Sequence, residues 1–279
     1  MLSGAPMTEL RVVETRGVAW RVDVTGEGRT VLCLHGAGGA GASWRGVAAA
    51  EASALQWVAP DLPGQGGSRS KAPGRGGLEA VASDLRDLLA TLSLSPDLVV
   101  GHSAGVAIAL QLALDGLRAP VLGFAPAILP FDGPAALMMP ALARLTALNP
   151  FAPYAIASGT SRAGVRAMIS GLGSRATEDS VALYTHLLSD PAHVGGTIAL
   201  MARWDVGRLA TRLKRLDVPV ALVLGGRDPA VPAAALQRLA ADHARIDLQI
   251  LPEFGHLLHE EAPRIAGDLI TAFLDRQND

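Results

Sequence analysis

Short apolar runs alternate with segments of helical periodicity through the first 125 residues of the chain. Residues 9–24 alternate apolar with polar positions around Arg16-Gly17, which predicts two strands joined by a turn. Apolar, partly β-branched runs typical of strands buried on both faces follow at residues 30–34, 56–59, 98–100 and 120–124. Helices are expected at 43–51, 78–92 and 107–114; the spacing in the second places Asp84, Arg86 and Asp87 on its outer face.

Strands that alternate with helices predict right-handed crossovers and a mainly parallel, doubly wound sheet of the α/β class. The alternation stops between residues 126 and 205, where prolines separate helical fragments and no strand is evident. It resumes with strands at 218–224 and 246–251 and helices at 233–241 and 263–274. We therefore expect an α/β core formed by residues 1–125 and 206–279, with a helical cap inserted at 126–205.

The cap contains two apolar sets at helical spacing. They are Leu137, Met138, Leu142, Leu145 and Leu148, and then Val181, Tyr184, Leu187 and Leu188. Four of the six methionines and both tyrosines also lie in this segment. Each such residue taken singly is explained by packing of the cap on the core. Together they favour a large, adaptable apolar pocket, for which the candidate substrate-binding residues are Trp44, His102, Phe131, Met138 and Trp204.

Gly101, Ser103 and Gly105 form a G-x-S-x-G pattern between the strand at 98–100 and the following helix. A serine on so tight a turn points its hydroxyl out of the sheet, and the glycines let neighbouring elements pass close to it. The backbone N–H of Ala104, at the start of the helix, would face an anion that forms beside Ser103. The alternative is an ordinary glycine-bounded turn in a chain with 31 glycines.

The strand at 30–34 ends in His35-Gly36-Ala37-Gly38-Gly39-Ala40-Gly41, a loop of backbone N–H groups without bulky side chains. Beside Ser103, this loop favours an oxyanion hole in which Ala37 supplies the second N–H. A phosphate-binding loop is the alternative, but the P-loop lysine and the G-x-G-x-x-G pattern are missing. Asp61, in the next such loop, is expected to cap a turn.

Asp228 and His256 each follow a later predicted strand, so they should meet Ser103 at the carboxyl edge of the sheet. The chain order serine, aspartate, histidine is that of a hydrolase triad. In that arrangement the histidine takes and returns the proton of the serine, while the aspartate holds the imidazole tautomer. The alternatives are that Asp228 is a turn residue and His256 a helix-capping histidine.

Composition narrows the class of protein. A net charge of −2 gives no reason to expect binding to nucleic acid. The single cysteine, Cys33, excludes an internal disulfide, fits a reducing compartment and is expected to be buried and inert. No signal peptide or membrane-spanning run is evident. His186 and His193 lack neighbours at metal-ligand spacing, so we expect surface or capping histidines and no metal site.

The chain resembles the α/β-hydrolase superfamily from His35-Gly36 through Asp61-Leu62-Pro63-Gly64 to Gly255-His256. Aspartate nucleophiles distinguish the dehalogenase and epoxide-hydrolase branches, which Ser103 argues against. Gln65 stands where many relatives have histidine. Within the superfamily, the cap is similar to that of bacteriochlorophyll-biosynthesis proteins described as magnesium-chelatase accessory proteins (BchO type). That similarity rests on residues 129–131, 145–150, 171–174, 190–194 and 201–205.

This resemblance implies a cytoplasmic role in photosynthetic pigment synthesis near magnesium insertion into protoporphyrin. Two hypotheses follow. The chain is a serine hydrolase that needs no cofactor and acts on an ester of a large apolar substrate, such as a tetrapyrrole. Alternatively, it is a non-catalytic tetrapyrrole-binding accessory or carrier that associates with magnesium chelatase. A C–C bond hydrolase or cofactor-free haloperoxidase is a weaker third hypothesis, since it would use the same triad.

Overall fold

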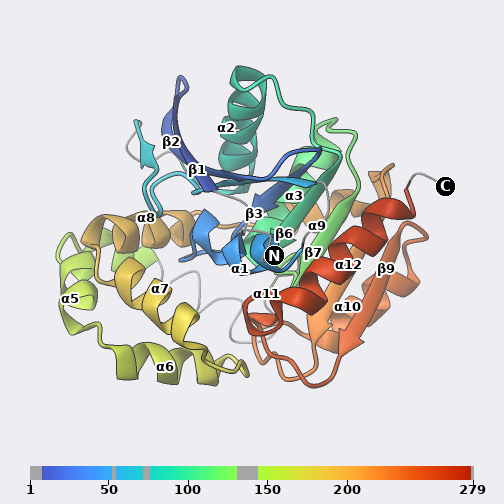
Figure 1. Cartoon of the computed structure of the whole chain (residues 1–279). Coiled ribbons are helices and arrows are strands. Elements are labelled where there is room, and N and C mark those ends of the chain that lie inside the picture. Colours follow the sequence, from blue (N-terminus) through green and yellow to red (C-terminus); the bar gives the residue numbers. More distant parts are fainter. Residues whose placement is uncertain (1–7, 52–54, 72–75, 131–143, 278–279) are drawn as a thin grey trace, which may run out of the picture.

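The structure is a computed structural model that describes residues 8–51, 55–71, 76–130 and 144–277. Within these ranges, nine strands form one sheet in the order β1-β2-β4-β3-β6-β7-β8-β9, with β5 paired to β2 (Figure 1). The strands are β1 (Thr8–Glu14), β2 (Val18–Thr25), β3 (Arg29–Leu34), β4 (Leu55–Pro60), β5 (Arg69–Ser70), β6 (Leu98–His102), β7 (Val121–Phe124), β8 (Val220–Gly225) and β9 (Ile246–Leu251). Pairings from β4 through β9 are parallel, and those of β2 are antiparallel.

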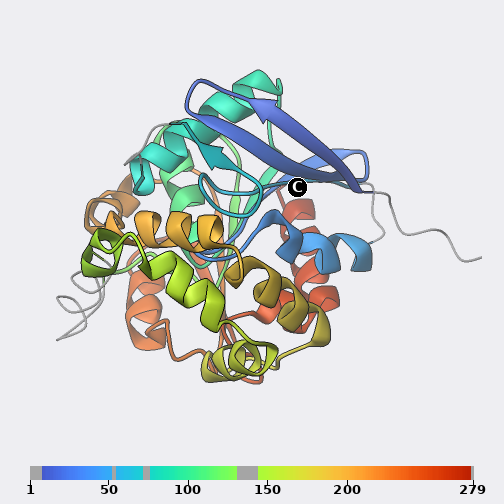
Figure 2. The same cartoon turned by 90° about the vertical axis from the view of Figure 1, so that its left-hand side faces the viewer.

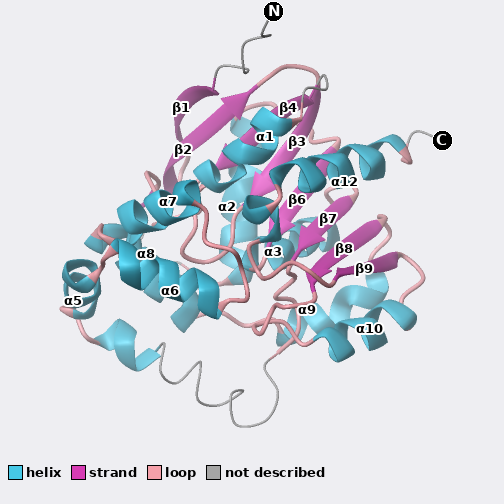
Figure 3. Cartoon of the chain, turned by 60° about the horizontal axis from the view of Figure 1, so that its bottom comes forward, coloured by secondary structure: helices cyan, strands magenta, loops and turns pink. Residues whose placement is uncertain are grey.

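Helices cover both faces of this sheet, as a doubly wound fold requires. One apolar core lies between the sheet and α2 (Leu78–Thr91), α3 (Ala104–Leu114), α9 (Gly207–Arg212) and α10 (Ala233–Ala241). The other lies under the 3₁₀ turn Gly41–Trp44, α1 (Arg45–Ala50), α11 (Leu258–Glu261) and α12 (Pro263–Asp275). Figure 3 shows α1 and α12 in front of the sheet and α2 and α3 behind it. The predicted mainly parallel α/β architecture is confirmed.

Among the helices between β7 and α9, the four whose bounds are described in full face the reader in Figure 2. They are α5 (Ala152–Gly159), α6 (Arg162–Gly171), α7 (Glu178–Leu188) and α8 (Pro191–Ala202), and the described part of residues 126–205 contains no strand. Side chains of Ser161, Thr177 and Asp190 cap the last three at their N-termini. We call these helices, the segments that join them and residues 144–151 the cap. The cap packs against loops that follow the carboxyl ends of strands, through contacts given below.

Two predictions from periodicity are corrected. Asp84 is 2% exposed rather than on the outer face of α2, because it lies three residues after Val81 and four before Leu88, within the same buried stripe. Leu145 and Leu148 are 66% and 79% exposed, so they do not share the apolar packing of Val181, Tyr184 and Leu187, which are buried. Leu137, Met138 and Leu142, like Phe131, lie outside the described residues.

Candidate active site

Ser103 occupies a strained turn between β6 and α3. Its backbone has φ 50° and ψ −114°, a region that non-glycine residues rarely adopt and that costs on the order of 1–3 kcal/mol. Gly105 permits the close packing behind this turn, because a Cβ there would lie 2.2 Å from the carbonyl oxygen of Leu34 in β3. The turn therefore holds the side chain of Ser103 out from the strand end, as the G-x-S-x-G pattern predicts.

His256 and Asp228 form a hydrogen-bonded pair. His256 Nδ1 lies 2.7 Å from Asp228 Oδ2, and the carboxylate side chain is 0% exposed. Asp228 Oδ1 accepts a second bond from the N–H of Ala230 at 2.8 Å, which fixes the rotation of the carboxylate. Because Nδ1–H donates to the carboxylate, Nε2 carries the lone pair that a general base needs. The side chain of Ser103 makes no hydrogen bond to any described residue, a looseness common in unliganded hydrolases.

Four bonds hold the loop that carries His256. Its carbonyl accepts from His102 Nε2 at 3.0 Å, and its N–H donates to the carbonyl of Leu172 at 3.1 Å. The flanking N–H groups of Gly255 and Leu257 donate to Glu261 Oε1 and Ser174 Oγ. Leu172 and Ser174 belong to the cap, in the segment between α6 and α7. The cap therefore contributes directly to the position of His256.

Two backbone N–H groups are free beside Ser103. Neither the N–H of Ala37 nor that of Ala104 donates to an acceptor among the described residues. The loop that contains Ala37 lies against the turn, since a Cβ on Gly36 would be 3.1 Å from Ser103 Cβ. Ala104 is 3% exposed, and buried N–H groups normally find partners. An oxyanion hole needs two such N–H donors beside the nucleophile.

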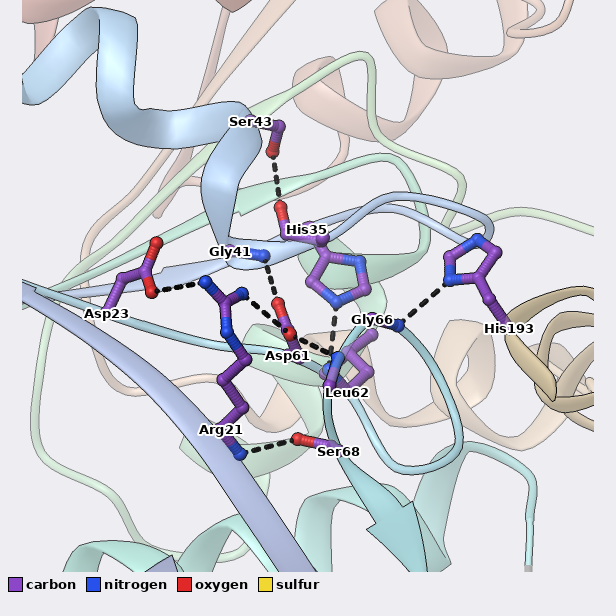
Figure 4. Close-up of polar contacts among 12 residues, drawn as sticks. Arg21, Asp23, His35, Gly41, Ser43, Asp61, Leu62, Gly66, Ser68 and His193 are labelled. Atoms are coloured by element: carbon purple, nitrogen blue, oxygen red, sulfur yellow. Dashed lines mark hydrogen bonds and ion pairs between the residues drawn. The ribbon is translucent and has the colours of Figure 1, made fainter. Parts of the chain in front are cut away.

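Buried polar groups brace the Ala37 loop from behind (Figure 4). His35 donates through Nδ1 to the carbonyl of Gly36 at 2.7 Å and accepts through Nε2 from the N–H of Leu62 at 2.8 Å. Asp61 accepts from the N–H groups of Gly41 and Gly67, both at 2.7 Å, and pairs with Arg21 at 3.1 Å. Burial lowers the pKa of His35 to about 4, so the ring stays neutral, as these bonds require. The capping role predicted for Asp61 is confirmed.

A cap histidine joins the same network. His193, on α8, is 0% exposed. Its Nδ1 accepts from the N–H of Gly66 at 2.9 Å, and its Nε2 donates to the carbonyl of Gly38 at 3.1 Å (Figure 4 shows the first bond). Gly38 is also held through its N–H by Gln65 Oε1 at 2.7 Å. The expectation of a surface or capping histidine is therefore wrong for His193, whereas His186 is exposed.

The candidate substrate-binding residues lie elsewhere than expected. Trp44 is 1% exposed and packs against His259 in the core, so its ring is closed to a ligand. His102 is 4% exposed, and its Nε2 donates to the carbonyl of His256. Trp204 is half-buried and packs against the core that α2, α3, α9 and α10 cover. Phe131 and Met138 lie outside the described residues. In each described case the core or the loop network accounts for the side chain.

The histidine and cysteine side chains give no sign of a metal site. Within the described ranges, no group of three or more histidine, cysteine, aspartate or glutamate side chains is placed to hold a metal ion. Cys33 is fully buried, and burial raises the pKa of its thiol, which fits the expected inert residue. No helix in the described part of the chain is long and apolar enough to cross a bilayer.

Glu260 provides a pH test of how the cap is attached. Its carboxyl accepts from the hydroxyl of Tyr184 on α7 at 2.8 Å, and burial raises its pKa to about 8. Between pH 4.5 and 8 the folded protein therefore holds a proton that the unfolded chain releases, so this group's contribution to stability falls as pH rises. The melting temperature of the parent should fall more between pH 5 and pH 8 than that of Glu260→Gln. Glu253→Gln, a change at an exposed glutamate, is the control. If both variants show the same pH dependence of the melting temperature as the parent, Glu260 does not contribute in this way.

The residues that sequence patterns missed are those that hold loops together. Ser174, Gln65 and His193 bond to partners distant in the chain, and Glu261 bonds both to nearby Gly255 and to the distant N–H of Arg175. Neither spacing nor strand position marks these residues. The segments at 171–174 and 190–194 were noted only for their resemblance to one type of cap. In the structure, these segments contact the loops of His256 and Ala37 respectively.

Comparison with known proteins agrees with this geometry. The family model described as "Alpha/beta hydrolase family" matches residues 31–266. The magnesium-chelatase 30 kDa subunit of Rhodobacter capsulatus is 39% identical over 264 residues, which cover 92% of each chain. The dihydrolipoyllysine-residue acetyltransferase component of the acetoin cleaving system of Pseudomonas putida is 27% identical, over 96% of this chain and 70% of its own.

Solved structures with the same fold are more distant in sequence. The epoxide hydrolase CorEH without ligand superposes with a TM-score of 0.79 at 21% identity, covering 98% of this chain and 99% of its own. An esterase from Exiguobacterium antarcticum superposes with a TM-score of 0.77 at 18% identity, covering 96% and 100%. At this level of identity, the similarity shows that the proteins share a fold.

Proposed function

The chain belongs to the alpha/beta hydrolase family, and on that premise we propose that it is a serine hydrolase that cleaves an ester of a large apolar substrate. The observation that carries the proposal is the pair formed by His256 and buried Asp228 at 2.7 Å. Two further observations support it: Ser103 lies on a strained turn, and two backbone N–H groups near it have no acceptor among the described residues. Histidine and aspartate joined in this way have the arrangement that activates a serine hydroxyl.

In the proposed reaction, Ser103 Oγ attacks the ester carbonyl carbon while His256 Nε2 takes the hydroxyl proton. The N–H groups of Ala37 and Ala104 donate to the oxyanion, each contributing on the order of 10²–10³ in rate. The tetrahedral intermediate expels the alcohol, which receives the proton from His256. Water then hydrolyses the acyl-serine by the same steps, and Asp228 stabilises the imidazolium in both halves.

For the substrate, we propose an ester of a tetrapyrrole. The support is the 39% identity to a relative named as a magnesium-chelatase subunit, together with the cap over the site. A cytoplasmic location and an association with magnesium chelatase belong to the same proposal. They rest on that relative's name and, for location, on the single buried cysteine.

A second candidate function is a tetrapyrrole-binding accessory protein whose triad is idle. The observation that favours it is the name of the 39% identical relative, which states a subunit of magnesium chelatase and no hydrolysis.

Ester turnover separates the two candidates. We would measure hydrolysis of p-nitrophenyl butyrate and of protoporphyrin dimethyl ester by the purified protein. The hydrolase proposal predicts turnover of both esters, with the higher kcat/KM for the porphyrin ester. A folded protein that binds the porphyrin but hydrolyses neither ester would contradict that proposal and support the accessory function.

His193 should affect turnover without touching the substrate. His193→Phe keeps a ring of similar size but removes the bonds to Gly66 and Gly38, which loosens the loop that presents the Ala37 N–H. We expect kcat to fall roughly tenfold, less than the 10²–10³ for loss of a whole oxyanion donor, with little change in KM. His186→Phe, an exposed change on the same cap, is the matched control. Equal kcat in the two variants would show that His193 does not position the loop.

A further inference from the structure

A groove of about 620 Å³ lies on the cap, on the side of α8 away from the core. Its apolar lining includes Leu148, Pro150, Pro153 and Ile198, and a Cβ on Gly195 of α8 would lie 3.5 Å from Pro153 of α5. Figures 1 and 3 both show α5 beside α8. The volume falls within the roughly 300–1,000 Å³ of small-molecule sites.

Two arginines line the same groove, Arg144 and Arg203. Arg144 Nε donates to the carbonyl of Ala202, and Arg203 Nη1 donates to that of Ala199. Neither guanidinium forms an ion pair with a carboxylate in the described part of the chain. Asp205, a nearby acid, accepts from the N–H of Gly207 instead. Each guanidinium is thus held by one bond and keeps other N–H donors for an anion.

The first of the two segments that line the groove opens a stretch without acidic residues. Residues 144–177 contain four arginines and no acidic residue, in a chain whose net charge is −2. Two of the four, Arg162 and Arg166, pair with Glu178, and Arg175 donates to the carbonyl of Glu261. Arg144 is the member of this set that lines the groove. Like the guanidinium of Arg175, that of Arg144 donates to a carbonyl and has no carboxylate partner among the described residues.

The groove and the Ala37 loop share helix α8. His193, Gly196, Thr197 and Leu200 recur at helical spacing on the face toward the core. Gly196 lets this face approach closely, because a Cβ there would lie 1.8 Å from the carbonyl oxygen of Gly64. Gly195, Ile198, Ala199 and Ala202 form the opposite face, which lines the groove. A ligand in the groove would therefore contact the helix that braces the oxyanion loop.

We propose that this groove binds a small molecule with an apolar body and carboxylate groups, which Arg144 and Arg203 receive. A tetrapyrrole with its propionates is such a molecule, so the choice of probe rests on the proposed function. The site itself does not depend on the chemistry of Ser103. Guanidinium groups suit this role because they bind carboxylates with paired N–H donors and pack on planar apolar surfaces.

The test is a titration with protoporphyrin IX, followed by quenching of tryptophan fluorescence. Arg144→Gln/Arg203→Gln should weaken binding at least tenfold, given two lost charge-assisted bonds. The matched control is Arg86→Gln/Arg118→Gln, which removes the same charge from arginines paired with Asp115 and Asp217, and it should bind like the parent. The affinity of the parent should also fall with added salt, and that of the groove variant much less.

The dimethyl ester of the same porphyrin separates charge from apolar contact. The parent should bind the dimethyl ester more weakly than it binds the free acid. The dimethyl ester should have the same affinity for the parent and for the groove variant. Equal affinity of the parent and groove variant for the free acid would overturn the proposal, as would absence of binding to the folded parent. Ser103→Ala should bind normally. If the parent hydrolyses esters but the groove variant binds protoporphyrin IX as the parent does, the groove proposal is wrong and the hydrolase proposal stands. If the parent binds protoporphyrin IX through the groove but hydrolyses no ester, the hydrolase proposal is wrong and the groove proposal stands.

Discussion

Replacement of Ser103 by alanine is expected to lower ester turnover by a factor on the order of 10⁴–10⁶, the range for loss of a triad nucleophile. The hydroxyl is the attacking group in the proposed reaction, and no other described side chain is placed to replace it. Because Ser103 Oγ has no hydrogen-bond partner among the described residues, its removal should change the free energy of unfolding by less than about 0.5 kcal/mol. Turnover of p-nitrophenyl butyrate and thermal melts measure the two effects.

Glycine at the same position supplies the control. Ser103 has φ 50°, which glycine adopts without steric cost. Ser103→Gly should therefore lose turnover to the same extent as alanine but melt at a higher temperature than the parent, since strain of about 1–3 kcal/mol is relieved. Residual turnover near the parent level in either variant would remove Ser103 from the reaction. A lower melting temperature for Ser103→Gly would show that the turn is not strained.

Replacement of Asp228 by asparagine is expected to lower kcat by a factor on the order of 10³–10⁴. The amide has the size of the carboxylate but can donate to His256 Nδ1, which would place the proton on Nε2 and leave no base facing Ser103. The imidazolium formed during the reaction would also lose its buried counter-charge, which now lies 2.7 Å from Nδ1. The rates of acylation and of deacylation, followed by burst kinetics, should both fall.

Asp205→Asn is the matched change for this prediction. Asp205 also accepts a backbone N–H two residues ahead, as Asp228 does, but it lies on the surface away from His256. Its variant should keep the kcat of the parent. If Asp228→Asn retained more than about a tenth of the parent kcat, the pair would be a structural contact.

Most of the longer elements of the core could be predicted because each is determined by a local pattern, whereas the short elements β5, α9 and α11 were not predicted. The helix at 233–241 and the strand at 246–251 agree with α10 and β9 residue for residue. Ser103, Asp228 and His256 could be nominated because each follows a predicted strand, and parallel strands present their carboxyl ends at one edge. The carbonyl partner of His193 lies 155 residues away, and such a contact leaves no mark in local spacing.

The polarity of a side chain was a poor guide to its exposure where tertiary contacts determine its position. Trp44 and His102 are amphipathic side chains near the site in sequence, yet both are buried as support for the loops around it. Leu148 is apolar, yet it is exposed on the rim of the cap groove. Which face of a helix meets a partner depends on how the cap packs, and periodicity alone does not contain that information.

The activation of Ser103 is the central claim, and labelling by a fluorophosphonate tests it most directly, because this reagent reacts with activated serines whatever their natural substrate. We predict stoichiometric labelling of the parent at Ser103, none of Ser103→Ala, and labelling of Asp228→Asn slowed on the order of 10³-fold. Failure of the folded parent to react, or equal labelling of the parent and Ser103→Ala, would contradict the serine-hydrolase account.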